Sequence, residues 1–288
     1  MAQSLTLDAP LIAPWQIADF VRDGTVKLPG LLEPSWIDKL LRAFDDMKSA
    51  AFDMSAYYED AGQPAAPAFS TLVRDENWTT NAEMRNFVFD SPIAEAAAAV
   101  IGASRVNIYE DLLIYKAAGS GGPTPWHQDE PQWPVTGTQM ASIWLCLEKA
   151  TLATGALRFV AGSHRGPLYE PYAPASQQAG IEADRHYFTG GILPDVDADP
   201  VRYPVISFDT EPGDVVAFHP RVIHGAFGSA TDHPRRTFSI RFLGDDVRWQ
   251  SKASVVLAWL AEVKLRNGDA MDGERFPQIW PSPRSESA

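Results

Sequence analysis

Apolar residues recur with helical spacing through the first hundred residues of the chain. Along Trp36–Met47 they fall at positions i, i+4, i+5 and i+8, which places them on one face of a helix. Similar patterns predict helices at Ile17–Arg22 and Ser91–Ile101, and a short strand is predicted at Val26–Leu28. The segment 1–104 is therefore expected to form a mainly helical N-terminal part.

The pattern changes near Arg105 to short runs of β-branched and aromatic residues, separated by Gly, Pro, Asp and Thr. Such runs with turn residues between them are typical of a β-sandwich or barrel. The predicted strands are Arg105–Glu110, Leu112–Lys116, Pro125–Asp129, Ser142–Glu148, Ala156–Val160, Val205–Phe208, Val215–Phe218 and Thr237–Leu243. The expected fold class is mostly β with flanking helices, and its β core spans 105–245.

Two segments without clear periodicity are interpreted as lids. The first is the proline-rich stretch Gly166–Pro204, and the second is Phe52–Ser70. Long irregular segments in compact domains are often functional. A last helix is predicted at Ala253–Arg266, inside a C-terminal helix and tail over 246–288. We expect these parts to form a single domain over 1–288.

Composition excludes several classes of function. The chain has 24 basic and 37 acidic residues, a net charge of −13 and a pI of about 4.8. This balance disfavours binding to nucleic acid or to anionic membranes, both of which require clustered Lys and Arg. The single cysteine, Cys146, rules out an intrachain disulfide and favours a reducing compartment. No targeting or transmembrane signal is evident, so a cytoplasmic location is expected.

The strongest chemical signal is the run Trp126-His127-Gln128-Asp129. On a strand, alternate side chains share a face, so His127 and Asp129 would point to the same side. A third ligand for a metal would come from one of the other histidines, which are His164, His186, His219, His224 and His233. Two histidines and one carboxylate are typical of non-haem Fe(II) oxygenases, although the same ligands also suit Mn or Zn.

Five ordered segments carry a resemblance to a known family: Thr124–Asp129, Ser142–Leu147, Gly155–His164, Gly213–His219 and His224–Gly225. In this order they resemble the phytanoyl-CoA dioxygenase family of Fe(II)/2-oxoglutarate-dependent oxygenases. The resemblance covers most of the chain, from about Asp19 to Phe242. It implies a double-stranded β-helix, the cupin-like jelly roll, with a metal at one open end.

The resemblance also implies roles for single residues. His127, Asp129 and His224 would hold Fe(II), with His219 as the rival for the third position, and 2-oxoglutarate and O2 would be the cosubstrates. The family's arginine for the far carboxylate of 2-oxoglutarate lies eleven residues after the distal histidine, which is Arg235 here. Arginine suits this task because its planar fork binds a carboxylate bidentately.

Strand alternation supports Arg235, because it places Arg235 on a polar face with Thr237, Ser239 and Arg241. The next candidate is Arg236, on the apolar face.

Further residues match the family's cosubstrate pocket less closely. Gln128 and Trp144 stand at such positions, and Lys116 would face either the site or solvent. Ala226 is a departure, because the family often has Ser two residues after the distal histidine. Four aromatic residues are candidates for an apolar substrate pocket: Tyr109, Trp126, Trp133 and Phe159.

The predicted function is hydroxylation of a small organic metabolite, with 2-oxoglutarate converted to succinate and CO2. Two other classes stay open from the residues alone. One is a cupin-like isomerase or hydrolase that uses its metal as a Lewis acid. The other is a jelly roll that binds a ligand without catalysis. The sequence leaves the oligomeric state open.

Overall fold

The computed structural model describes residues 10–53, 71–119, 122–173, 175–229 and 231–282. The α-helices before the first long strand are α1 (Pro14–Asp23), α2 (Pro34–Lys48), α4 (Asn77–Thr80), α5 (Ala82–Asp90) and α6 (Ile93–Ile101). The predicted helices correspond to α1, α2 and α6, whereas α4 and α5 were not predicted. Among the described residues, no helix combines the length and apolar character needed to cross a membrane.

The larger sheet follows the spatial order β1-β10-β7-β12-β4-β3-β2, with β14 also beside β4. Its strands are β1 (Thr25–Leu28), β2 (Phe52–Asp53), β3 (Thr71–Asp75), β4 (Val106–Lys116), β7 (Met140–Cys146), β10 (Val215–Phe218), β12 (Arg235–Leu243) and β14 (Gln278–Trp280). All neighbouring strands of this sheet are antiparallel.

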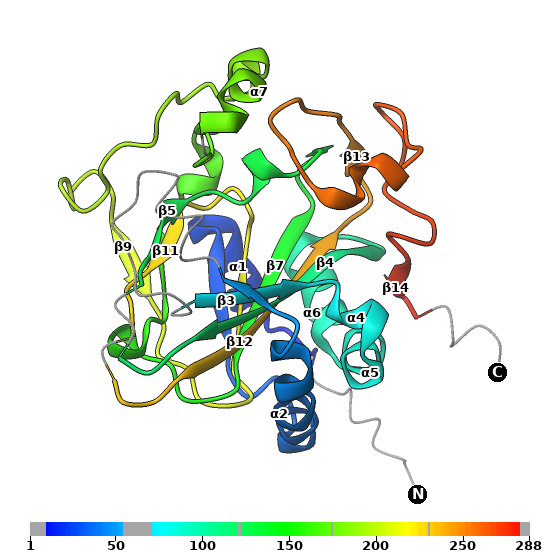
Figure 1. Cartoon of the computed structure of the whole chain (residues 1–288). Helices are drawn as coiled ribbons and strands as arrows, with labels where there is room; N and C mark the ends of the chain where they lie inside the picture. Colours follow the sequence, from blue (N-terminus) through cyan, green and yellow to red (C-terminus); the bar gives the residue numbers. More distant parts are fainter. Residues whose placement is uncertain (1–9, 54–70, 120–121, 174, 230, 283–288) are drawn as a thin grey trace, which may run out of the picture.

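The smaller sheet has the order β5-β11-β8-β9 and faces the larger one (Figure 1). Its strands are β5 (Thr124–His127), β8 (Leu157–Val160), β9 (Val205–Ser207) and β11 (His224–Ala226). A buried cluster from both sheets fills the space between them, including Trp144, Phe159 and Phe218. The predicted sandwich of the jelly-roll class is therefore present. A short ribbon pairs β6 (Val135–Thr136) with β13 (Arg248–Trp249).

The N-terminal helices cover the outer face of the larger sheet (Figure 1). On β12, Phe238, Ile240 and Phe242 are fully buried in this helix-facing core. Phe44 of α2 packs edge-on against Phe238, with ring centroids 5.7 Å apart. Because alternate residues face opposite sides, Arg235, Ser239 and Arg241 of β12 face the inside of the sandwich.

Three predicted elements differ in the structure. The strands expected before and after Asp111 are one continuous strand, β4. The sequence suggested a break there, but Asp111 is buried and accepts a hydrogen bond from the Trp78 amide at 3.2 Å. The strand expected to reach Asp129 ends at His127. Asp129 has helical φ and ψ and leads into a 3-10 turn, Glu130–Gln132.

The C-terminal helix predicted at Ala253–Arg266 is wrong. The structure has only a 3-10 turn there, Ala258–Glu262. Tertiary packing explains the difference, because Trp259 and Val263 pack on a separate cluster around Tyr109. The lid interpreted at 166–204 contains the short helix α7 (Gln178–Ala183) between 3-10 turns. Most of the other expected lid, at 54–70, lies outside the described residues.

Candidate metal and cosubstrate site

His127 and His224 stand opposite each other on neighbouring strands. The two residues are register partners where the end of β5 pairs with the start of β11. Their ring centroids are 4.2 Å apart. The short loop between Phe218 and His224 returns the chain into the smaller sheet, which brings a residue far along the sequence to the end of β5.

Backbone carbonyls fix the orientation of both imidazoles. The Nδ1 atom of His127 lies 2.8 Å from the Pro125 carbonyl oxygen, and that of His224 lies 3.0 Å from the Val222 carbonyl oxygen. A carbonyl oxygen only accepts hydrogen bonds, so each Nδ1 carries the proton and each Nε2 is left with a free lone pair. Metal-binding histidines are commonly oriented in this way.

Asp129 completes the cluster from just beyond β5. Its Oδ1 lies 3.4 Å from Nε2 of His127 and 3.8 Å from Nε2 of His224. All three donor atoms lie within 4.8 Å of one another. The backbone N–H of Asp129 donates to the Pro220 carbonyl oxygen at 2.8 Å, which holds the turn beside the loop that precedes His224.

Charged neighbours keep the Asp129 carboxylate ionised. Burial alone would raise the pKa of Asp129, but Arg241, His224 and His127 outweigh it and hold the pKa well below its usual range. Burial, followed by the charge of His127, lowers the pKa of His224 to about 3. The anionic Asp129 oxygen and the Nε2 atoms of the two histidines form a donor set that fits a divalent metal ion.

A buried arginine lies in the same cavity and forms no ion pair with any residue that the structure describes. Arg235 is 3% exposed, and its Nε and Nη1 atoms have no hydrogen-bond partner among the described residues. Its guanidinium lies 5.7 Å from the ring centroid of Trp144, whose indole N–H is also buried and unpartnered. An uncompensated buried charge is costly unless a ligand pairs with it. These orphaned donors therefore fit a ligand carboxylate.

Lys116 lies beside this arginine on the paired strand β4. It is fully buried and its Nζ donates to the Gly122 carbonyl oxygen at 2.9 Å. Burial, followed by the charge of Arg235, lowers the pKa of Lys116 far below its usual range. The sequence left its direction open, and the structure places Lys116 inside.

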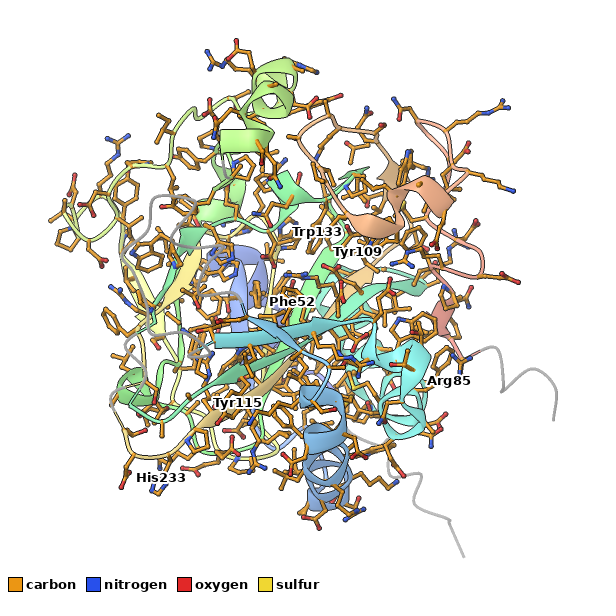
Figure 2. All side chains as sticks on the ribbon, viewed as in Figure 1. Phe52, Arg85, Tyr109, Tyr115, Trp133 and His233 are labelled. Atoms are coloured by element: carbon orange, nitrogen blue, oxygen red, sulfur yellow. The ribbon has the colours of Figure 1, made fainter. Side chains whose placement is uncertain are left out.

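The cluster and Arg235 line one cavity of about 300 Å³. Tyr109 and Trp133 form part of its wall, with ring centroids 4.9 Å apart, and Phe52 lies at the same cavity (Figure 2). Two of the aromatic residues expected at a substrate pocket are therefore present there. The other two do not line it: Trp126 donates to Asp197, and Phe159 lies in the core between the sheets.

The two rival candidates, His219 for the third metal ligand and Arg236 for the cosubstrate arginine, form other contacts. Nε2 of His219 lies 3.0 Å from the Thr138 carbonyl oxygen, and its Nδ1 accepts from the Arg221 amide, so neither nitrogen is free. Arg236 points to the opposite face of β12 and pairs with Glu148.

Gln128 does not line the cavity that holds the cluster. Its side-chain amide donates to the carbonyl oxygens of Pro167 and Arg221, and its oxygen accepts from the Tyr169 amide. The predicted contact of Gln128 with the cosubstrate thus has no support in this geometry.

Sequence reasoning missed the ion-pair network behind the cluster. Arg241 pairs with Glu110 of β4, and its second Nη lies 3.3 Å from Oδ2 of Asp129. Ser142 also donates to Oδ2 of Asp129, at 3.4 Å. The alternation on β12 that singled out Arg235 also placed Arg241 on the inner face, which was the available signal.

Comparison with known proteins identifies close similarity to one family. The model of the family described as phytanoyl-CoA dioxygenase (PhyH) matches residues 20–237. A probable phytanoyl-CoA dioxygenase of Caenorhabditis elegans is 31% identical over 161 residues, which are 54% of this chain and 49% of that protein. The peroxisomal phytanoyl-CoA dioxygenase of Rattus norvegicus is 24% identical over 255 residues, covering 85% of this chain and 72% of the relative. The match thus spans only about half of the nematode relative.

Solved structures show the same fold. The carbocyclase SnoK from nogalamycin biosynthesis superposes with a TM-score of 0.71 at 19% identity, covering 93% of this chain and 96% of that one. The epimerase SnoN, in a complex with Fe3+ and α-ketoglutarate, gives a TM-score of 0.70 at 21% identity, covering 92% and 97%. At these identities the likeness concerns the fold alone.

Proposed function

Because the chain belongs to the phytanoyl-CoA dioxygenase family of Fe(II)/2-oxoglutarate-dependent oxygenases, we propose that it hydroxylates a small organic metabolite. One observation carries the proposal. The cluster of His127, Asp129 and His224 shares a cavity with the unpaired, buried guanidinium of Arg235. A donor set for the metal and a cation for the cosubstrate are thus combined in one place.

His127, Asp129 and His224 would hold Fe(II), each through one donor atom. When bound, the metal would supply the activation of O2 that couples substrate oxidation to conversion of 2-oxoglutarate into succinate and CO2. The protein's part is to present the donors in the correct state. The carbonyls of Pro125 and Val222 keep each Nε2 unprotonated, and Arg241 keeps Asp129 anionic.

Arg235 would bind the far carboxylate of 2-oxoglutarate through its planar fork. The indole N–H of Trp144 and the ammonium of Lys116 lie at the same end, and a bound anion would favour the charged form of Lys116. Tyr109 and Trp133 would form the wall on which the substrate packs and from which water is excluded.

The alternatives left by the sequence are less well supported. A Lewis-acid isomerase or hydrolase has no need for an uncompensated arginine buried at the site. A binding module without catalysis has no need for three donors held in one protonation state. The solved epimerase and carbocyclase show that this fold serves other outcomes, so hydroxylation of this chain's substrate is part of the proposal.

The test is an anaerobic titration of the full chain with Fe(II) and 2-oxoglutarate, followed by the weak visible charge-transfer band of the chelate. We expect the band in the wild-type protein and its loss in His224→Ala. In Arg235→Gln, affinity for 2-oxoglutarate should fall roughly 10- to 100-fold, because a charged hydrogen bond contributes about 1.5–3 kcal/mol.

His219→Gln and Arg236→Gln serve as matched controls, because each changes the same residue type close by without touching the cluster. Both should keep the band and the affinity within about twofold, well under the effect of one lost hydrogen bond. Loss of the band in His219→Gln but not in His224→Ala would overturn the ligand assignment. A wild-type protein that binds iron but shows no band with 2-oxoglutarate would overturn the proposed reaction.

A further inference from the structure

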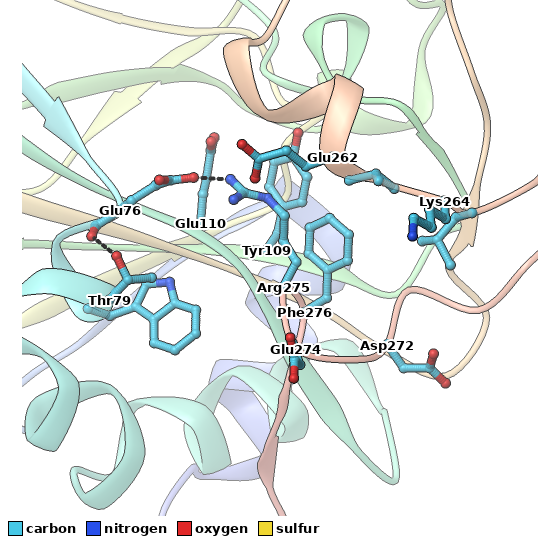
Figure 3. Close-up of a pocket in the computed structure, with 13 residues that line it drawn as sticks. Glu76, Thr79, Tyr109, Glu110, Glu262, Lys264, Asp272, Glu274, Arg275 and Phe276 are labelled. Carbon is cyan, nitrogen blue, oxygen red and sulfur yellow. Dashed lines mark hydrogen bonds and ion pairs between the residues drawn. The ribbon is translucent and has the colours of Figure 1, made fainter.

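Figure 3 shows a second cavity, with a volume of about 500 Å³. Tyr109 and Glu110 of β4 line both cavities, so the two cavities adjoin at this pair of neighbouring residues. The rest of the second cavity comes from α4 and from the chain between residues 262 and 276. Its volume lies in the range of small-molecule sites.

Acidic side chains dominate the charge of this second cavity. Glu76 is neutralised by Arg275 and Glu110 by Arg241. Glu262, Asp272 and Glu274 also line the cavity and have no ion pair among the described residues; the remaining cation there is Lys264. Three unpaired carboxylates against one unpaired ammonium leave an excess of negative charge.

Apolar and aromatic surface completes the lining. Trp78 and Phe276 are nearly buried side chains at the wall, and Val263 and Leu265 are half-buried. Glu262 and Glu274 lie above and below the Arg275 side chain in Figure 3. An occupant would therefore meet an apolar surface flanked by carboxylates and by the Arg275 side chain, which is paired with Glu76.

A buried donor without a partner also lines this cavity. Tyr109 is 2% exposed, and its hydroxyl has no hydrogen-bond partner among the described residues. Buried tyrosine hydroxyls are usually bonded, so this hydroxyl is a donor that a ligand in the cavity can use. In Figure 3 the hydroxyl points to the same end of the cavity as the Glu262 carboxylate.

Backbone strain occurs at the same place. Glu76 has a φ of 54°, the one positive φ of a non-glycine residue among those described. A residue with a Cβ is strained in this left-handed conformation, and such strain tends to gather at functional sites. The Glu76 conformation places its carboxylate on Arg275, at the cavity.

We propose that this second cavity binds the distal part of the substrate, and that this part carries an ammonium group on an apolar or aromatic body. The inference rests on the proposed function, because it identifies the class of substrate for the oxidation in the first cavity. The ammonium group would lie at the Glu262 carboxylate, with Glu274 adding negative charge on the other side of Arg275, and the Tyr109 hydroxyl would contact the ligand where the two cavities adjoin.

A contact chain joins the second cavity to the candidate metal cluster. Glu110 lines the second cavity and pairs with Arg241, which lies 3.3 Å from Asp129. A cation bound in the second cavity adds positive charge close to the Glu110–Arg241 pair. Occupation of the second cavity should therefore change the surroundings of Asp129.

The test uses phenethylammonium as the probe, with 3-phenylpropionate and 2-phenylethanol as anionic and neutral analogues of similar shape. Calorimetry on the metal-free full chain should show saturable binding of the cation alone, weaker at high salt because exposed charges are screened. With Fe(II) and 2-oxoglutarate bound under anaerobic conditions, the cation should shift the visible band.

Variants locate the probe. Glu262→Gln and Glu274→Gln should each weaken binding of phenethylammonium roughly two- to fivefold, as expected for pairs with exposed carboxylates. Tyr109→Phe should weaken it about two- to tenfold, with no loss of stability, because the hydroxyl bonds nothing in the free protein. Glu95→Gln, an exposed change on α6 away from the cavity, is the control and should leave affinity unchanged.

Each result decides the proposal. Equal binding of 3-phenylpropionate, or cation affinity that is the same in all variants, would overturn it. Specific cation binding that leaves the band of the iron complex unmoved would overturn its assignment to the substrate. If no iron–2-oxoglutarate band forms at all, the proposed function fails, while cation binding to the metal-free protein is still measured independently.

Discussion

Arg241 is the residue on which the electrostatics of the site depend. It pairs with Glu110 and also lies 3.3 Å from Asp129, so one guanidinium faces two buried carboxylates. Burial raises the pKa of Glu110 even though Arg241 opposes the shift. Without the arginine, both carboxylates would lose their main source of compensation.

We therefore expect Arg241→Met to lower the free energy of unfolding by about 3–5 kcal/mol, the usual cost of stranding a buried charge. In the double variant Arg241→Met/Glu110→Gln one stranded charge is removed, so the loss should be clearly smaller than the sum of the two single losses. Urea unfolding of the four proteins measures this coupling. Strictly additive losses would contradict the network.

At the scale of elements, the Gln128 side chain ties β5 to the insert over 166–204. It bonds Pro167 and Tyr169 of the insert and Arg221 of the loop before β11. A second tie holds the insert to the C-terminal segment, because Asp184 accepts from the N–H and hydroxyl of Ser254. The insert is thus fixed near its start and near its middle by buried polar side chains.

Gln128→Leu should therefore loosen the insert rather than remove a cosubstrate contact. Buried backbone groups lose their partners, which costs about 1–3 kcal/mol for each unsatisfied group. Hydrogen exchange within residues 166–173 should rise at least tenfold, while affinity for 2-oxoglutarate stays within about threefold, less than the loss of one hydrogen bond to it. Asp184→Asn, which changes the second tie only, is the comparison. A large loss of 2-oxoglutarate affinity with unchanged hydrogen exchange would instead support the contact between Gln128 and the cosubstrate that the sequence predicted.

Local patterns predicted the elements that bury one regular face. The α2 helix and strand β12 were predicted because their apolar residues follow periods near 3.6 and 2. The prediction of a C-terminal helix was wrong because the apolar residues of this irregular segment pack against Tyr109 and Phe276. That contact joins distant parts of the chain. Strand β11 was not predicted because its sequence, His-Gly-Ala, has no periodic signal.

The same distinction applies to the site. The run of residues 126–129 and the spacing to Arg235 are local signals, and the structure brings His127, Asp129, His224 and Arg235 to one cavity. The strand argument for Asp129 was wrong in detail, since Asp129 leaves the strand and turns back. The Glu110–Arg241 pair depends on the register of β4 against β12, which the sequence does not encode locally. The second cavity depends on contacts of β4 with α4 and with the chain after residue 261, which are equally non-local.

For the whole molecule, Asp111 joins the helical part to the sheets. It is fully buried on β4, and its carboxylate accepts from the backbone of Trp78 in α4. Residues of α1, α2, α5, α6 and the larger sheet belong to one buried cluster around this junction. Ionisation of a single carboxyl at this place therefore acts on the stability of the entire fold.

Burial raises the pKa of Asp111 from its ordinary 3.8 to about 7, more than its hydrogen bonds from Asn77 and Trp78 lower it. Between these two pH values the folded chain binds more protons than the unfolded chain. The stabilisation that protonated Asp111 contributes is therefore complete below about pH 4 and is lost as the pH rises through about 7. Asp111→Asn keeps an acceptor for the Trp78 amide and cannot ionise. We compare the free energy of unfolding of this variant with that of wild type at each pH. From pH 4.5 to pH 8 the difference should move in favour of the variant by a few kcal/mol, at most on the order of 4.

Urea unfolding of both proteins at the two pH values isolates this group, because the other titrating residues are common to both. The control is Asp38→Asn, a change at an exposed position on α2. Its free energy of unfolding should differ from that of wild type by the same small amount at both pH values. If the difference between Asp111→Asn and wild type is the same at pH 4.5 and pH 8, then Asp111 is ionised in the folded state throughout. The helical part would in that case be held to the sheet by a charged carboxylate, and the loss of stability towards alkaline pH would have to come from another residue.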